Sequence, residues 1–297
     1  MPTAGHFQDP TETITGGHST LRLYHADAIE LLATLPEGLV DVIVTSPPYN
    51  LGIAYGSYDD ALPGNQYLAW TRDWLGAARR VLAPDGSLFL NVGAKPTEPW
   101  TAFDIVAQAR ERLTLQNTIH WIKSIVIDRE LVGAGSGLER DLAVGHYKPV
   151  NSPRFLNDCH EFVFHLTPSG RTPLERRAIG VRYQDESNID RWKAASEGLR
   201  CRGNTWFIPY ETIQNRDRDR PHPATFPVLL AERCLRLHGV HRGAVVLDPF
   251  MGLGNTAIAC SELDVDFVGV DVNADYVTEA ATRIRSVVAE ASGRLPY

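Results

Sequence analysis

The stretch Asp41–Asn50 reads Asp-Val-Ile-Val-Thr-Ser-Pro-Pro-Tyr-Asn and carries both a fold signal and a chemical one. Residues 42–44 are a β-branched apolar run, which is typical of a buried strand. The two prolines that follow cannot donate backbone hydrogen bonds, so the strand ends there. It therefore delivers the hydroxyl of Ser46, the carbonyl of Pro47 and the ring of Tyr49 to its carboxyl end, where open α/β sheets bind ligands.

These groups supply two hydrogen-bond acceptors and a stacking surface, without a strong acid, a strong base or a thiol. They suit a planar group that carries an amine. A proline-rich turn that merely closes a strand, with the tyrosine as ordinary packing, is the simpler alternative for these ten residues.

Strand and helix patterns alternate around this stretch. Asp27 is placed to cap a helix that begins near residue 28. The order β-α-β-α-β-α-β predicts an α/β fold, a doubly wound and mostly parallel sheet with helices on both faces. The ranges that carry these patterns are strands at 21–24, 42–44, 87–92 and 117–123, helices at 28–35, 66–82 and 96–112, and a turn at 84–86.

A second strand, turn and helix pattern lies near the end of the chain. Residues 244–247 read as a buried strand, and a glycine-rich turn with Gly252 and Gly254 leads into a helix. Glycines let a backbone approach a ligand closely, and the helix start offers unpaired N–H groups. The next strand ends in Asp271, which is placed to accept the two ribose hydroxyls of a nucleoside.

Thr45-Ser46-Pro47-Pro48-Tyr49 together with Asp-Pro-Phe-x-Gly-x-Gly at 248–254 and Val-Gly-Val-Asp at 268–271 resembles the DNA amino-methyltransferases. The order of the motifs, catalytic first and cofactor last, resembles the circularly permuted beta class. The resemblance implies transfer of a methyl group from S-adenosylmethionine, leaving S-adenosylhomocysteine, to the exocyclic amine of a base flipped out of double-stranded DNA, with no metal. Catalytic residues implied in this way are Ser46, Pro47, Pro48 and Tyr49. Cofactor-binding residues are Asp27, Thr45, Phe226, Asp248, Phe250, Gly252, Gly254, Asn255, Thr256 and Asp271.

Four segments follow from the patterns and the resemblance. Residues 1–17 are expected to be a flexible arm, and 18–123 the catalytic half of the methyltransferase domain. Residues 124–204 break the strand and helix rhythm and are expected to be a target-recognition insertion with one returning strand at 161–166. Residues 205–297 are the expected cofactor half. The irregular stretch 52–64 is expected to be a lid or a DNA-contacting loop, with a plain surface excursion as the alternative.

The composition is that of an ordinary globular protein, with 43% hydrophobic and 22% charged residues. The net charge of −7 is unusual for a DNA-binding protein, although the middle block, residues 121–220, has a balance of +2. The four cysteines are widely spaced, which fits reduced thiols in a cytoplasmic protein. No apolar run has the length of a membrane span. The expected partners are double-stranded DNA and, in a restriction system, a cognate endonuclease, with the chain as a monomer or homodimer.

Three functions compete. In the family that the chain resembles, a serine before Pro-Pro-Tyr is typical of N4-cytosine enzymes, and an aspartate there is typical of N6-adenine enzymes. Ser46 therefore favours cytosine, and adenine is the alternative. The third possibility is a catalytically silent module that binds nucleic acid, against which the intact cofactor motif speaks.

Overall fold

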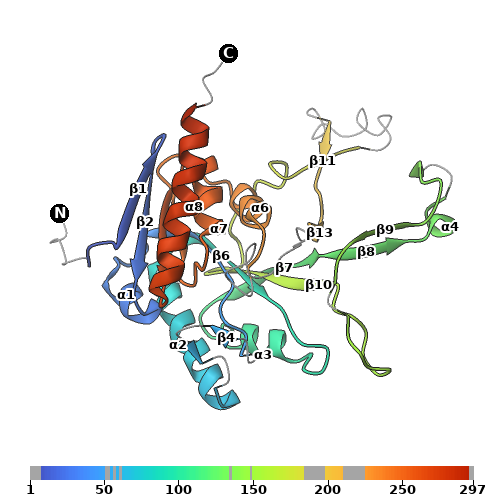
Figure 1. Cartoon of the computed structure of the whole chain (residues 1–297), viewed down its shortest axis with the longest axis horizontal. Helices are drawn as coiled ribbons and strands as arrows, with labels where there is room; N and C mark the ends of the chain where they lie inside the picture. The colour runs from blue at the N-terminus through green and yellow to red at the C-terminus, as the bar shows by residue number, and fades with distance from the viewer. Residues whose placement is uncertain are drawn as a thin grey trace.

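The structure is a computed structural model that describes residues 8–50, 54–55, 58–59, 62–133, 136–147, 149–183, 198–209 and 225–293. Within these residues the chain forms a nine-stranded sheet in the order β1-β2-β15-β14-β3-β6-β10-β7-β13 (Figure 1). The strands are β1 (Glu12–Gly16), β2 (Ser19–His25), β3 (Val40–Thr45), β6 (Leu82–Val92), β7 (Thr114–Ile122), β10 (His160–Thr167), β13 (Thr205–Phe207), β14 (Val245–Asp248) and β15 (Asp266–Asp271). All except β1 and β10 run in the same direction.

Helices cover both faces of the sheet and form two separate hydrophobic cores. One core packs α6 (Val228–His238), α7 (Asn255–Glu262) and α8 (Ala274–Gly293) against one face. The other packs α1 (Ala28–Thr34), α2 (Gly64–Val81) and α3 (Thr101–Ala107) against the opposite face. Strand residues alternate between the two, because Val42 belongs to the first core and Ile43 to the second. The structure confirms the predicted doubly wound α/β fold.

The functional stretch lies at the centre of this sheet. From β3 the chain passes through α2 to β6 on one side, whereas from β14 it passes through α7 to β15 on the other. The strands β3 and β14 are parallel neighbours, with Val42 opposite Val246 and Ile43 opposite Leu247. The chain order therefore reverses between β3 and β14, which is the position where open α/β sheets bind ligands.

Three local expectations were wrong. Residues 12–16, placed in a flexible arm, form the edge strand β1, where Ile14 is the one buried side chain and the apolar pattern is correspondingly weak. The turn expected at 84–86 lies inside β6, which begins at Leu82. The helix expected over 96–112 is limited to α3 (Thr101–Ala107). At its end the backbone N–H groups of residues 108–110 bond to carbonyls three residues back, which is the tighter turn that often ends an α-helix.

The expected insertion contains strands of its own. The β8 (Ser124–Ile127) and β9 (Leu142–Gly145) hairpin, which carries α4 (Arg129–Val132), extends away from the main sheet (Figure 1). The returning strand predicted at 161–166 is present as β10, between β6 and β7. A short pair, β11 (Val181–Arg182) and β12 (Leu199–Arg200), follows. Residues 184–197 and 210–224 lie outside the described residues.

The loop after the catalytic stretch is described only in part. Its pieces β4 (Ala54–Tyr55) and β5 (Tyr58–Asp59) pair antiparallel, and the remainder of 51–61 lies outside the described residues. The expectation of a lid or DNA-contacting loop therefore stays a prediction. None of the described helices is long and apolar enough to cross a membrane.

Burial of His165 predicts a pH dependence of stability. Its ring is fully buried, stacks on Phe89 and bonds to Asn117 and Ser87, and burial lowers its pKa to about 4. Below its usual pKa of 6.5, the unfolded chain takes up a proton that the folded chain does not bind. Stability should therefore fall between pH 6.5 and 4, by on the order of 2 kcal/mol more in the wild type than in His165→Gln. Urea unfolding at a series of pH values measures this, and parallel pH curves for the two proteins would contradict it.

Candidate active site

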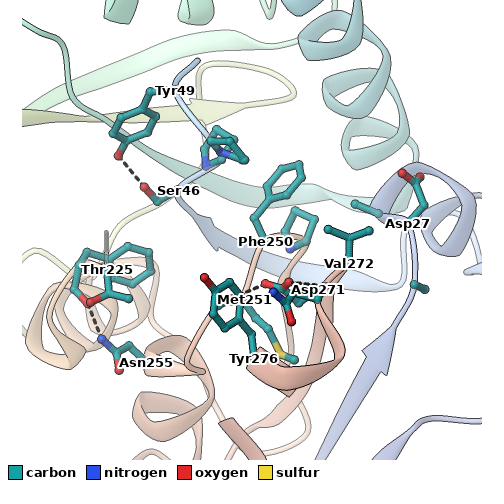
Figure 2. Close-up of a pocket in the computed structure, with 18 of the residues that line it drawn as sticks. Asp27, Ser46, Tyr49, Thr225, Phe250, Met251, Asn255, Asp271, Val272 and Tyr276 are labelled. Atoms are coloured by element: carbon teal, nitrogen blue, oxygen red, sulfur yellow. Dashed lines mark hydrogen bonds between the residues drawn. The ribbon is translucent and has the colours of Figure 1, made fainter. Parts of the chain in front are cut away.

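A cavity opens at the carboxyl ends of β3, β14 and β15. It contains about 1030 Å³ of space between the atoms, part of it open to solvent. Ten predicted site residues line it together: Asp27, Ser46, Pro47, Pro48, Tyr49, Phe226, Phe250, Gly252, Asn255 and Asp271. Figure 2 shows Ser46 and Tyr49 on one side of this space, Asn255 on another, and Asp271 and Asp27 farther along. The predicted catalytic and cofactor stretches, far apart in sequence, thus meet in one cavity.

The predicted catalytic loop, residues 46–49, is held by a hydrogen bond from α2 and by one between two of its own side chains. Tyr67 on α2 donates its hydroxyl to the carbonyl of Pro48, at 2.6 Å. The hydroxyls of Ser46 and Tyr49 lie 2.5 Å apart. Tyr49 is only 9% exposed, so most of its ring packs inside the protein and its role as a stacking plate for a base stays a prediction.

Asp271 at the end of β15 is held by two backbone donors. Gly252 N and Asn273 N donate to its two carboxylate oxygens at 2.9 and 2.8 Å. Burial raises the pKa of Asp271, while these two N–H groups lower it. Each carboxylate oxygen keeps a second lone pair. The carboxylate can therefore accept further hydrogen bonds from a ligand in the cavity.

A buried carboxylate lies beneath the cavity. Asp248 is 1% exposed and accepts hydrogen bonds from Thr45 Oγ1 at 2.8 Å, Thr256 Oγ1 at 2.7 Å and Phe250 N at 3.1 Å. Burial raises its pKa to about 6, against the effect of these donors. Thr45, Asp248 and Thr256 do not line the cavity, so in this structure they support the site from below.

The glycine turn and the first helix make two further contributions. Gly254 has φ +76°, and a Cβ there would lie 3.2 Å from Ala280 and Ile284, so this glycine allows α8 to pack closely rather than lining the cavity. Asp27 caps α1 by accepting from Ile29 N and Glu30 N, and it also lines the cavity. Its helix-capping and site roles are thus compatible.

Asn255 at the start of α7 joins two segments of the cavity wall. It donates to the carbonyl of Phe226 at 2.6 Å and accepts from Arg283 on α8 at 3.0 Å. The sequence had indicated Phe226 only through the family resemblance.

Several lining residues were missed by the sequence analysis. They include Trp70, Thr225, Met251, Val272, Asn273 and Tyr276. Trp70 packs against Phe250, with ring centroids 5.4 Å apart. Trp70 belongs to an apolar helix pattern and Tyr276 to the first turns of the last helix, so neither carries a local signal that separates a cavity wall from a core.

Residues 40–282 match the model of the N6/N4 methyltransferase family, described as DNA methylase. The chain belongs to this family. It is therefore a DNA methyltransferase, and the predicted family is confirmed. The type II methyltransferase M.HpaI of Haemophilus parainfluenzae is 30% identical over 265 residues, which cover 89% of this chain and 74% of that protein. The DNA adenine methyltransferase YhdJ of Escherichia coli (strain K12) is 24% identical over 90% of this chain and 84% of its own length.

Two solved structures show the same fold as this family member. The cytosine-N4-specific PvuII DNA methyltransferase matches with a TM-score of 0.64 at 15% identity, covering 95% of both chains. A putative DNA modification methylase from Thermus thermophilus, complexed with S-adenosylmethionine, matches with a TM-score of 0.57 at 26% identity, covering 90% of this chain and 94% of the other. In the part of this methyltransferase that the structure describes, no three His, Cys, Asp or Glu side chains gather as metal ligands.

The hydrogen bond from Thr45 predicts a pH-dependent loss of stability. Thr45→Val removes a donor to Asp248, which is ionised above pH 6 and neutral below it. A hydrogen bond to a charged group contributes more than one to a neutral group, so the variant should lose about 1–3 kcal/mol at pH 8 and less at pH 5. The measurement is denaturant unfolding at both pH values. Thr34→Val, whose hydroxyl donates to the Leu31 carbonyl, is the control and should lose the same amount at both.

Proposed function

We propose that this DNA methyltransferase transfers a methyl group from S-adenosylmethionine to the exocyclic N4 amine of a cytosine flipped out of double-stranded DNA. The observation that carries the proposal is the shared cavity, which brings Ser46 and Pro47 together with Asp271 and Phe250. The product of the cofactor is S-adenosylhomocysteine. No metal takes part in the proposed step.

The cavity wall fits S-adenosylmethionine. Asp271 offers carboxylate lone pairs for ribose hydroxyls, and Phe250 and Val272 offer apolar surface for the adenine. Asp27 lies at the same end, where it can accept from the adenine amine. Phe226 and Asn255 also line the wall, where Asn255 donates to the Phe226 carbonyl, and they are assigned to the methionine end. The relative from Thermus thermophilus that was solved in complex with S-adenosylmethionine supports this choice of cofactor.

The protein groups act on the base rather than on the cofactor. When bound, S-adenosylmethionine supplies an electrophilic methyl group on a positively charged sulfur. Ser46 and the Pro47 carbonyl hold the amine-bearing edge of the flipped base, so the nitrogen lone pair faces the methyl group. Transfer would join the methyl carbon to this nitrogen with cleavage of the sulfur–carbon bond, and the proton released from the amine would pass to solvent water. Positioning, rather than a strong base, lowers the barrier.

Cytosine is proposed rather than adenine because a serine at the position of Ser46 is typical of N4-cytosine enzymes. The adenine-specific relative YhdJ favours N6-adenine as the second candidate, with the same cavity and the same cofactor.

Residues 124–204 are proposed as the target-recognition insertion, between the catalytic and cofactor halves of the domain. Residues 171–220 carry 11 basic and 8 acidic side chains, which favours phosphate contacts. A cognate endonuclease, a cytoplasmic location and a monomeric or homodimeric state belong to the same proposal.

Asp271→Ala tests the cofactor site. Removing the carboxylate should weaken S-adenosylmethionine binding by about 1–3 kcal/mol, because the ribose hydroxyls lose their acceptor. Isothermal calorimetry on the folded variant measures this. Asp275→Ala, in the first turn of α8 and outside the cavity lining, is the matched control. Unchanged affinity in Asp271→Ala would overturn the assignment.

The methylated nucleoside decides the target base. DNA is incubated with the protein and cofactor carrying a labelled methyl group, digested to nucleosides and analysed by mass spectrometry. N4-methylcytosine is expected, with turnover lowered in Ser46→Ala and cofactor affinity retained. Recovery of N6-methyladenine alone would overturn the cytosine assignment and leave the cofactor site standing.

A further inference from the structure

Behind Ser46 lies a chain of polar side chains to which the methyl-transfer step above assigns no role. Tyr49 Oη lies 2.5 Å from Ser46 Oγ (Figure 2) and 2.8 Å from Asn91 Nδ2. Asn91 Nδ2 lies 2.8 Å from Glu161 Oε2, and Lys123 Nζ lies 2.8 Å from Glu161 Oε1. The chain therefore runs from a charged pair, through an amide and a phenol, to the hydroxyl at the cavity.

The surroundings fix these groups in place. Asn91 is 3% exposed, and the side chains of Lys123 and Glu161 are each 13% exposed. Gly93 provides the space, because a Cβ there would lie 3.2 Å from both the Glu161 side chain and the Tyr49 ring. Asn91 lies on β6, Glu161 at the start of β10 and Lys123 directly after β7, so the sheet sets their spacing.

The hydrogen-bond direction follows from the chemistry of the outer members. An ammonium group only donates and a carboxylate only accepts, so Asn91 has to present its NH₂ group to Glu161. The opposite amide orientation would aim Asn91 Oδ1 at the carboxylate. In the orientation observed, Oδ1 has no hydrogen-bond partner among the described residues, whereas Nδ2 has three acceptors within reach. The second N–H of Asn91 therefore donates to Tyr49 Oη.

The phenol passes this direction on to Ser46. The Tyr49 oxygen accepts from Asn91, so Tyr49 donates its own hydrogen elsewhere. Ser46 Oγ at 2.5 Å is the nearest acceptor, ahead of the backbone carbonyl of Asn91 at 3.1 Å and Glu161 Oε2 at 3.4 Å. A phenol is also a stronger donor than an alkyl hydroxyl, since its pKa is about 10. Asn91 Nδ2 is also 3.3 Å from Ser46 Oγ, but its two hydrogens go to the nearer acceptors, Glu161 and Tyr49. Ser46 Oγ therefore accepts its hydrogen bond on the protein side from Tyr49.

We propose that Glu161 and Asn91 are positioning residues that make Tyr49 donate to Ser46, so that Ser46 points its own hydroxyl hydrogen into the cavity and donates to an unprotonated ring nitrogen of the target base. The inference rests on the proposed function and deepens it. The ring nitrogen is the one next to the exocyclic amine: N3 of cytosine, or N1 of adenine. Donation to this nitrogen locks the base in plane and leaves its amine for the Pro47 carbonyl.

The first test is a double-mutant cycle on turnover. Tyr49→Phe keeps the ring and its packing but removes the hydroxyl, and Asn91→Ala removes the amide. Each should lower kcat roughly three- to tenfold while the affinity for S-adenosylmethionine stays unchanged, and the double variant should be no slower than Tyr49→Phe alone. Multiplicative losses in the double variant would overturn the inference, because the two residues would then act independently.

The second test changes the base. The target nucleotide is replaced by 3-deazacytosine, which keeps the amine but lacks the ring nitrogen (or by 1-deazaadenine if adenine is the methylated base). The base ratio is defined as turnover on the natural base divided by turnover on the analogue. This base ratio should fall in Tyr49→Phe and Asn91→Ala toward the value found for Ser46→Ala. An unchanged ratio in Tyr49→Phe would overturn the inference, and this variant keeps the test decisive even if Asn91→Ala does not fold.

Asn117→Ala is the matched control, because this β7 asparagine bonds to buried His165 rather than to the catalytic loop. It should lower stability but leave both kcat and the base ratio unchanged. The outcomes also separate the two proposals. Failure of the unaltered protein to methylate any DNA overturns the proposed function, whereas normal methylation with an unchanged base ratio overturns only the orientation of Ser46.

Discussion

One buried carboxylate joins the two halves of the site. Asp248 at the end of β14 accepts a hydrogen bond from the hydroxyl of Thr45, 203 residues earlier on β3, and another from the hydroxyl of Thr256 on α7. A carboxylate with 1% exposure destabilises the fold unless donors surround it, so the three groups have to stay together. The same contact sets the catalytic strand beside the glycine turn. Since Ser46 directly follows Thr45, the distance between the Ser46 hydroxyl and the glycine turn is fixed by this contact.

The second constraint comes from a strand that runs against the others. β10 enters the sheet antiparallel between β6 and β7, so its first residues lie where its neighbours end. Glu161, the second residue of β10, is thereby brought to the same sheet edge as Asn91, the next-to-last residue of β6. A parallel strand in this place would put its first residues at the opposite edge of the sheet. The reversal of this one strand therefore supplies the carboxylate that orders the polar groups behind the catalytic loop.

The sequence predicted the parts of this arrangement that have local signals. A β-branched run before Pro47, a glycine turn after Asp248 and an acid at the end of a strand are each visible within about ten residues. The polar chain through Asn91 and Glu161 has no local signal, because it depends on pairing between strands that are about 70 residues apart. The same limit explains Thr45 and Asp248: the motif shows that they belong to the site, whereas only the packed sheet shows that they lie beneath it.

The polar chain also bears on why a serine stands at position 46. Lys123 and Glu161 are paired at 2.8 Å behind the predicted catalytic loop, and Asp158 is a further carboxyl within electrostatic reach of both, its pKa raised mainly by burial. An ionised aspartate at position 46 would add another negative charge, bridged to Glu161 by a single phenol and a single amide. Two carboxylates that share one small site disfavour each other's ionisation. A neutral hydroxyl avoids this repulsion, and it can donate to a ring nitrogen, which an ionised carboxylate cannot do. The serine and the Lys123–Glu161 pair are therefore electrostatically matched, and this match favours a target whose amine lies beside an unprotonated ring nitrogen.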